Sequence, residues 1–170
     1  MRKICMPLAA SAFVMLGGSA FAQQPAAAPP PPPSYGQELS LEQARKAVAA
    51  AEAEAKKNNW FLAIAVVGPS GQLLHFARME NTQYGSIAIS QHKARAAANF
   101  RRPTKAFEDR IAQGGAGIAV MTLDDVIASE GGIPIVIQGK LVGAIGCSGA
   151  TGQQDGVACQ AGVNALAATQ

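Results

Sequence analysis

The two histidines, His75 and His92, are the side chains in this sequence best suited to bind a metal ion. His75 opens the segment His75–Met79, in which a period of two would place His75 and Met79 on one face and Arg78 on the other. Histidine is a common iron ligand, and methionine is a second one. The alternative is a polar strand residue followed by a core methionine.

A cluster of six cationic or potentially cationic side chains lies within 14 residues, from His92 to Lys105. Arginine suits carboxylates and phosphates because its planar guanidinium donates two parallel hydrogen bonds to them. The alternative is a solvated helix face. Thr104 would offer a hydroxyl at a helix start, or would simply cap that helix. The candidate cofactor-binding residues are therefore His75, Arg78, Met79, His92, Lys93, Arg101, Arg102, Thr104 and Lys105, with His75 and His92 as candidate metal ligands.

Other chemical motifs are few. The glycine-rich segment 143–152 leads from a strand into a helix, where free N–H groups favour anions, but it lacks the Gly-Lys-Ser/Thr ending of a P-loop. Ser148 lacks the second glycine of a nucleophile elbow, since position 150 is Ala. Asp124, Asp125 and Glu130 could form an acid–base pair or lie on a solvated loop. We predict no catalytic residue, and binding is favoured over enzymatic activity.

Two cysteines, Cys147 and Cys159, follow the N-terminal region. The first ends an expected strand and the second lies in the following helix, so a helix folded back on its strand could bring them together. The sequence leaves open whether they form a disulfide or remain buried thiols.

Residue patterns predict an α+β fold. Capping boxes at Ser40–Gln43 and Thr151–Gln154 begin the first and last helices. Two apolar strand pairs, each joined by a turn, predict two hairpins that build a central antiparallel sheet flanked by helices in layers. The expected helices are 41–58, 86–100, 104–113 and 151–168, and the expected strands are 61–67, 72–79, 118–121, 133–137 and 141–147.

The N-terminal residues predict export. Arg2 and Lys3 precede a short apolar run and the small-residue site Ala20-Phe21-Ala22, the pattern of a signal peptide over residues 1–22. An Ala/Pro-rich linker follows at 23–37, and one folded domain at 38–170. We expect a periplasmic or secreted protein without stable membrane insertion. The formal charge of +3, nearly neutralised when the signal leaves, gives no reason to expect nucleic-acid binding.

A series of short motifs follows in order along the folded part: Gly71, Leu73-Leu74, Phe76, Arg78-Met79, Lys93-Ala94, Ala97-Ala98, Phe100-Arg101-Arg102-Pro103-Thr104, Gly131-Gly132-Ile133-Pro134-Ile135, Val142-Gly143-Ala144-Ile145-Gly146, Ser148-Gly149-Ala150 and Gln154-Asp155. Through these residues the folded part, over about 41–168, resembles the GlcG/HbpS family of small haem-binding proteins, which is related to the C-terminal domain of PduO-type cobalamin adenosyltransferases. Four positions depart from the residue types usual in that family: Pro69, His75, Cys147 and Gly156.

This resemblance implies homo-oligomers that bind a tetrapyrrole. Haem is the expected ligand, and a corrinoid is the second choice. Arg101, Arg102 and Lys105 would lie near haem propionates, with Thr104 at the pocket edge and either His75 or His92 on the iron. The expected role is storage, delivery or sensing. Two alternatives stay open: an enzyme or auxiliary subunit that binds a small organic acid or a corrinoid, and a non-catalytic oligomeric interaction module.

Overall fold

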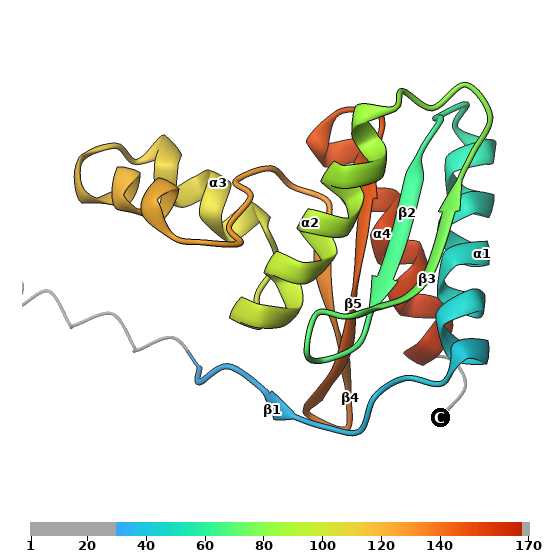
Figure 1. Ribbon diagram of the computed structural model, residues 1–170, viewed down its shortest axis with the longest axis horizontal. Coiled ribbons are helices and arrows are strands. Elements are labelled where there is room, and N and C mark those ends of the chain that lie inside the picture. Colours follow the sequence, from blue (N-terminus) through green and yellow to red (C-terminus); the bar gives the residue numbers. More distant parts are fainter. Residues whose placement is uncertain (1–29, 168–170) are drawn as a thin grey trace, which may run out of the picture. The chain divides into compact units, whose positions relative to one another are not determined.

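A computed structural model describes residues 30–167 of the chain, and Figure 1 shows its elements. No helix within this range is long and apolar enough to cross a bilayer. In chain order the elements are β1 (Ser34–Tyr35), α1 (Leu41–Lys57), β2 (Ala63–Val67), β3 (Leu73–Arg78), α2 (Gly85–Phe100), α3 (Lys105–Ala112), the 3-10 helix η1 (Gly115–Thr122), β4 (Gly132–Ile137), β5 (Lys140–Ser148) and α4 (Gly152–Ala167).

Strand β5 is the centre of the sheet. It pairs antiparallel with β4 along one edge and with β2 along the other, and β3 extends the sheet beyond β2. Both predicted hairpins, β2–β3 and β4–β5, are therefore present. The turn of the second hairpin contains Gln138 and Gly139, both with positive φ, as a tight two-residue hairpin turn requires.

Helices cover both faces of the sheet, which confirms the α+β class. Helices α1 and α4 pack together over one face, where Ile64, Val66 and Ile145 lie in the larger core cluster. Helix α2 covers the other face through alanines, among them Ala94 and Ala97. A side chain at Gly146 of β5 would collide with backbone atoms of α2, so glycine is what permits this close approach.

Both predicted capping boxes form. Ser40 Oγ accepts from Gln43 N while Gln43 Oε1 accepts from Ser40 N, and the same reciprocal pair joins Thr151 and Gln154. These bonds begin α1 and α4 close to the predicted residues.

Three structural expectations need correction. The strand predicted at 118–121 is wrong, because this segment belongs to η1; Gly114 and Gly115 adopt positive φ and start a tight turn instead of an extended strand. Strand β1, which pairs parallel with β5 and makes the sheet mixed, was not predicted and lies inside the expected linker. Thr104 stands at the start of α3 without a side-chain capping bond. The predicted signal at 1–22 lies outside the described residues.

Cys147 and Cys159 form a disulfide, which resolves the choice that the sequence left open. Their Cα atoms are 5.8 Å apart, and both residues are fully buried. The bond joins β5 to α4, so it fixes the last helix on the strand at the centre of the sheet.

Reduction of this disulfide should destabilise the domain. Closing a loop of this length, with the cysteines 12 residues apart, typically contributes about 2–4 kcal/mol. Urea unfolding with and without reductant measures the loss. A variant with both Cys147→Ala and Cys159→Ala should show no response to reductant, and free thiols in the untreated native protein would contradict the bond.

Candidate functional site

The fold places the two candidate metal ligands on opposite faces of the sheet. His75 pairs with Val66 in the β2–β3 register, so its side chain shares the sheet face covered by α1 and α4. His92 lies on α2, which covers the opposite face. Met79 is a core residue of the α1/α4 face, only 9% exposed. The two histidines therefore cannot bind the same iron in this structure.

The predicted cations lie at the two ends of α2. Arg78 precedes the loop that leads into this helix, whereas Arg101 and Arg102 follow its last residue. A helix of 16 residues is about 24 Å long, so Arg78 is far from the other arginines. The C-terminal group, continued by Thr104 and by Lys105 at the start of α3, is the larger set of cations, and His92 lies near the middle of α2 between the two ends.

Lys93 is held in a buried ion pair. It is 1% exposed, and its Nζ donates to Asp155 Oδ2 at 2.8 Å and to the Glu130 carbonyl oxygen at 2.6 Å. The second Asp155 oxygen accepts from Ala150 N. Burial raises the pKa of the Asp155 carboxyl above its usual value of 3.8, and the hydrogen bond and charge of Lys93 oppose that rise. With its ammonium committed to these partners, Lys93 acts in this structure as a structural residue.

Thr104 is also buried, and its polar groups are bonded to Gly132. Its N–H donates to the Gly132 carbonyl oxygen at 3.0 Å, and its Oγ1 accepts from Gly132 N at 2.9 Å. A side chain at Gly132 would clash with Thr104 and with the Lys93 backbone. Thr104 therefore fixes the first residue of β4 against α2 and the start of α3.

The remaining cations are closer to solvent. Arg101 donates from Nη1 to the Pro33 carbonyl oxygen at 3.2 Å, and its guanidinium lies over the Tyr35 ring. Arg102 is exposed and donates from Nε to the Phe100 carbonyl oxygen, which leaves other N–H donors of its guanidinium. Lys105 forms an ion pair with Asp109, whose hydrogen bond raises the pKa of the lysine.

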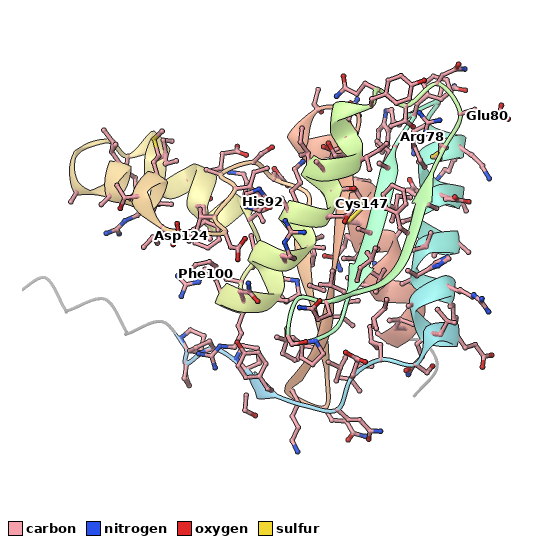
Figure 2. All side chains as sticks on the ribbon, in the orientation of Figure 1. Arg78, Glu80, His92, Phe100, Asp124 and Cys147 are labelled. Carbon is pink, nitrogen blue, oxygen red and sulfur yellow. A yellow bond between two sulfur atoms is a disulfide. The ribbon has the colours of Figure 1, made fainter. Side chains whose placement is uncertain are left out.

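Among the candidate site residues, His92 has the clearest unsatisfied ligand atom. Its Nε2 is buried and has no hydrogen-bond partner among the described residues. His92 and Phe100 are two helical turns apart on one side of α2, and Cys147 is seen on the other side (Figure 2). Phe100 packs edge-on against Phe107 of α3, with ring centroids 5.3 Å apart. This side of α2 thus combines an unpaired imidazole nitrogen with an aromatic pair.

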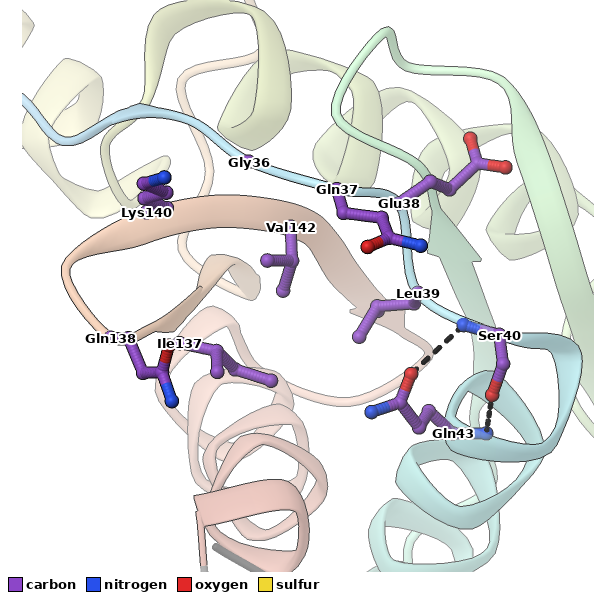
Figure 3. A pocket seen from close by; sticks show the side chains of 10 residues that line it. All are labelled: Gly36, Gln37, Glu38, Leu39, Ser40, Gln43, Ile137, Gln138, Lys140 and Val142. Atoms are coloured by element: carbon purple, nitrogen blue, oxygen red, sulfur yellow. Dashed lines mark hydrogen bonds between the residues drawn. The ribbon is translucent and has the colours of Figure 1, made fainter.

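A cavity of about 330 Å³ adjoins Lys105, where the start of α3, the segment before β4 and α4 meet. Its lining is mainly apolar, with Lys105, Glu130 and Gln160 as the charged and polar members. A larger hollow of about 560 Å³ lies between the start of α1 and the β4–β5 turn (Figure 3). That hollow contains none of the predicted site residues.

Sequence reasoning missed several partners. Asp155 was recognised only as part of a family motif, and no pattern linked it to Lys93, 62 residues away. Neither Phe107 beside Phe100 nor Tyr35 beside Arg101 was predicted, because these contacts join segments distant in the chain. The described residues contain no group of three or more His, Cys, Asp or Glu side chains able to hold a metal ion.

Removal of the Lys93 charge should destabilise the fold. In Lys93→Met the Asp155 carboxylate stays buried without its cation, which typically costs about 3–5 kcal/mol. The same substitution at exposed Lys56 of α1 is the control and should change stability by less than about 0.5 kcal/mol. Urea unfolding at neutral pH measures both, and equal effects would contradict a structural ion pair.

The pH dependence of this loss has a definite sign. Without Lys93, the folded-state pKa of Asp155 rises further above 3.8, so folded Lys93→Met binds a proton that the unfolded chain has already released. The free energy of unfolding of the variant then falls as the pH rises from the unfolded-state pKa of Asp155 to its folded-state pKa. In the native protein it falls less, because Lys93 opposes the rise of that pKa. The deficit of Lys93→Met should therefore grow from pH 4 toward neutrality, and a deficit that shrinks would contradict the assignment.

Comparisons with known proteins agree with this architecture. Residues 39–164 match the family described as haem degrading protein HbpS-like. Protein GlcG of Escherichia coli K12 is 41% identical over 110 residues, which cover 65% of this chain and 81% of GlcG.

Two solved structures share the fold. A double mutant of HbpS from Streptomyces reticuli has a TM-score of 0.71 at 29% identity, covering 85% of this chain and 98% of that one. The PduOC–haem complex has a TM-score of 0.69 at 24% identity, covering 75% and 94%. Since the family match spans most of the described sheet and helices, the chain belongs to the HbpS-like family.

Proposed function

We propose that this protein binds haem on the side of α2 that carries His92, and that it stores, delivers or senses this cofactor outside the cytoplasm. One observation carries the proposal: the buried Nε2 of His92 has no hydrogen-bond partner within residues 30–167, and His92 lies on the helix that ends in a cationic segment. Family membership supports it, as does the haem in the PduOC complex of the same fold.

His92 is the better of the two candidate iron ligands. A buried imidazole nitrogen without a hydrogen bond is costly, and coordination to iron would satisfy it. His75 lies on the face covered by α1 and α4, on the other side of the sheet from the cationic segment. Phe100, which is partly exposed, would offer apolar contact to a porphyrin bound beside His92, and the buried Phe107 packs against its ring.

The cations at the end of α2 would hold the propionates. His92 and Arg102 are separated by the last turns of α2, on the order of 15 Å along the chain, and propionate arms extend beyond the porphyrin rim toward such a cation. Arg102 is accessible to a carboxylate, whereas Arg101 would first leave Pro33 and Tyr35 and Lys105 would first leave Asp109. Bound haem would supply a redox-active iron whose behaviour depends on its axial ligand.

Export is part of the same proposal. The Cys147–Cys159 disulfide supports it, because such bonds persist mainly in oxidising compartments. Assembly into homo-oligomers stays a prediction, which the exposed apolar side chains of Ile118 and Met121 on η1 favour. Light scattering of the purified protein decides between a monomer and an oligomer.

Haemin titration tests the iron ligand. The 23–170 protein should give a saturable, stoichiometric shift of the Soret band, with sharp bands after reduction. His92→Ala should abolish or displace these bands, because the axial nitrogen is gone, whereas His75→Ala should leave them unchanged. The same bands in both variants would refute His92 as the ligand.

The same titration separates the alternatives. A broad change that never saturates would mean that haemin only adheres to apolar surface, and corrinoids and small organic acids would then be tried by thermal shift. Loss of the Soret band after a reductant and oxygen are added would indicate haem breakdown, and its persistence would favour storage or delivery.

Processing of the N-terminus tests export. If residues 1–22 are a cleaved signal, mass spectrometry of protein recovered from the periplasm should find Gln23 at the N-terminus. Ala20→Asp and Ala22→Asp together should block cleavage, because the processing site requires small residues. Intact protein that stays in the cytoplasm would contradict export.

A further inference from the structure

A third hollow, of about 490 Å³, lies in the loop between β3 and α2. It is at the N-terminal end of α2, a helix length away from the cations of the proposed haem site. Its lining is polar or charged throughout: Arg78, Glu80, Asn81, Thr82, Gln83 and Tyr84.

The Arg78 guanidinium is fixed at this hollow. Its Nη1 donates to the Thr82 carbonyl oxygen at 3.4 Å, and its central carbon lies 5.0 Å from the centre of the Tyr84 ring. Stacking on the ring holds the guanidinium plane and leaves N–H donors at its edge. A guanidinium held in this way is prepared to bind two oxygens of one oxyanion.

The start of α2 adds positive potential to the same place. No side chain caps this helix, and its first turn contains no acidic residue. In contrast, α1 and α4 have capping boxes together with Glu42 and Asp155 in their first turns. The N-terminal end of a helix carries a partial positive charge, and here no protein carboxylate in that turn offsets it.

Thr82 supplies an independent indication of a ligand. The residue lines the hollow and is only 4% exposed. Its Oγ1 is buried and forms no hydrogen bond within residues 30–167. Buried hydroxyls without a partner are rare because they lose hydrogen bonds to water without replacement. An oxyanion beside Arg78 would give this hydroxyl an acceptor.

Glu80 is the one acidic residue that lines the hollow. Figure 2 shows it at the outer tip of the loop, with Arg78 on the inner side. Its negative charge should weaken the binding of an anion at the hollow. Because the side chain is exposed, it should not prevent the anion from entering.

From these contacts we infer that the β3–α2 loop binds a small oxyanion, a carboxylate or a phosphate, at a site separate from the haem site. Arg78 provides the main charge, Thr82 a hydroxyl donor and the start of α2 its partial charge. Tyr84 positions Arg78 and, being 80% exposed, offers its ring to a planar organic acid.

The test is an NMR titration of ¹⁵N-labelled 23–170 protein with inorganic phosphate and, separately, with acetate, at constant ionic strength. Backbone amide shifts that saturate and are confined to about residues 78–88 are expected for one of the two anions, which identifies its class. Arg78→Gln should weaken binding about tenfold or more. Arg45→Gln, an exposed arginine near the start of α1, should leave it unchanged.

Two further variants separate binding from structure. Thr82→Val keeps the shape of the side chain and should lower the affinity for the anion. If the hydroxyl were merely structural, the affinity would stay unchanged. Glu80→Gln should strengthen binding. Shifts that do not saturate with either anion, or that are the same in Arg78→Gln, would overturn the site, and this result is independent of the haemin spectra of the His92 variant.

Discussion

The buried ion pair between Lys93 and Asp155 joins segments from both sides of the sheet. Lys93 comes from α2, Asp155 from the first turn of α4, and the Glu130 carbonyl oxygen from the segment before β4. Both charged side chains are almost completely removed from water, so neither tolerates loss of the other. The pair thereby connects the helices on the two faces of the sheet past the start of β4.

Glycines make room for this connection. Gly131 has positive φ, and a side chain there would meet Asp155, the Cys147 carbonyl oxygen and Lys93 Nζ. A side chain at Gly132 would meet the Lys93 backbone and Thr104 just as closely. The disulfide fixes β5 and α4 next to the same place, since Cys147 N donates to the Gly131 carbonyl oxygen. The double glycine at the start of β4 is thus required by packing.

Helix α2 decides where binding chemistry can occur. Its buried face, with Lys93 and the alanines, is committed to the sheet and to the ion pair. Its partly exposed side carries His92 and Phe100. Beyond its two ends lie two arginines with separate aromatic partners: Arg78 is next to Tyr84, and Arg102 is next to Phe107. Because the helix is rigid and about 24 Å long, the two ends can serve different ligands.

Local patterns in the sequence determined the helices, the two hairpins and the capping boxes, because short-range spacing and turn residues govern these features. They also placed the cationic residues near α2. These patterns could not determine the structure of residues 118–121, which belong to η1. An apolar run of four residues fits either a strand or a tight helix until its neighbours are known.

Contacts between distant segments were decided by the tertiary structure alone. Lys93 and Thr104 looked like ligand-binding residues in the sequence, yet packing gave them Asp155 and Gly132 as partners. The same packing paired the two cysteines and separated His75 from His92 by the thickness of the sheet. Residue types determined which chemistry was available, and the folded chain determined which groups remained free to perform it, because burial and pairing depend on neighbours that sequence spacing does not specify.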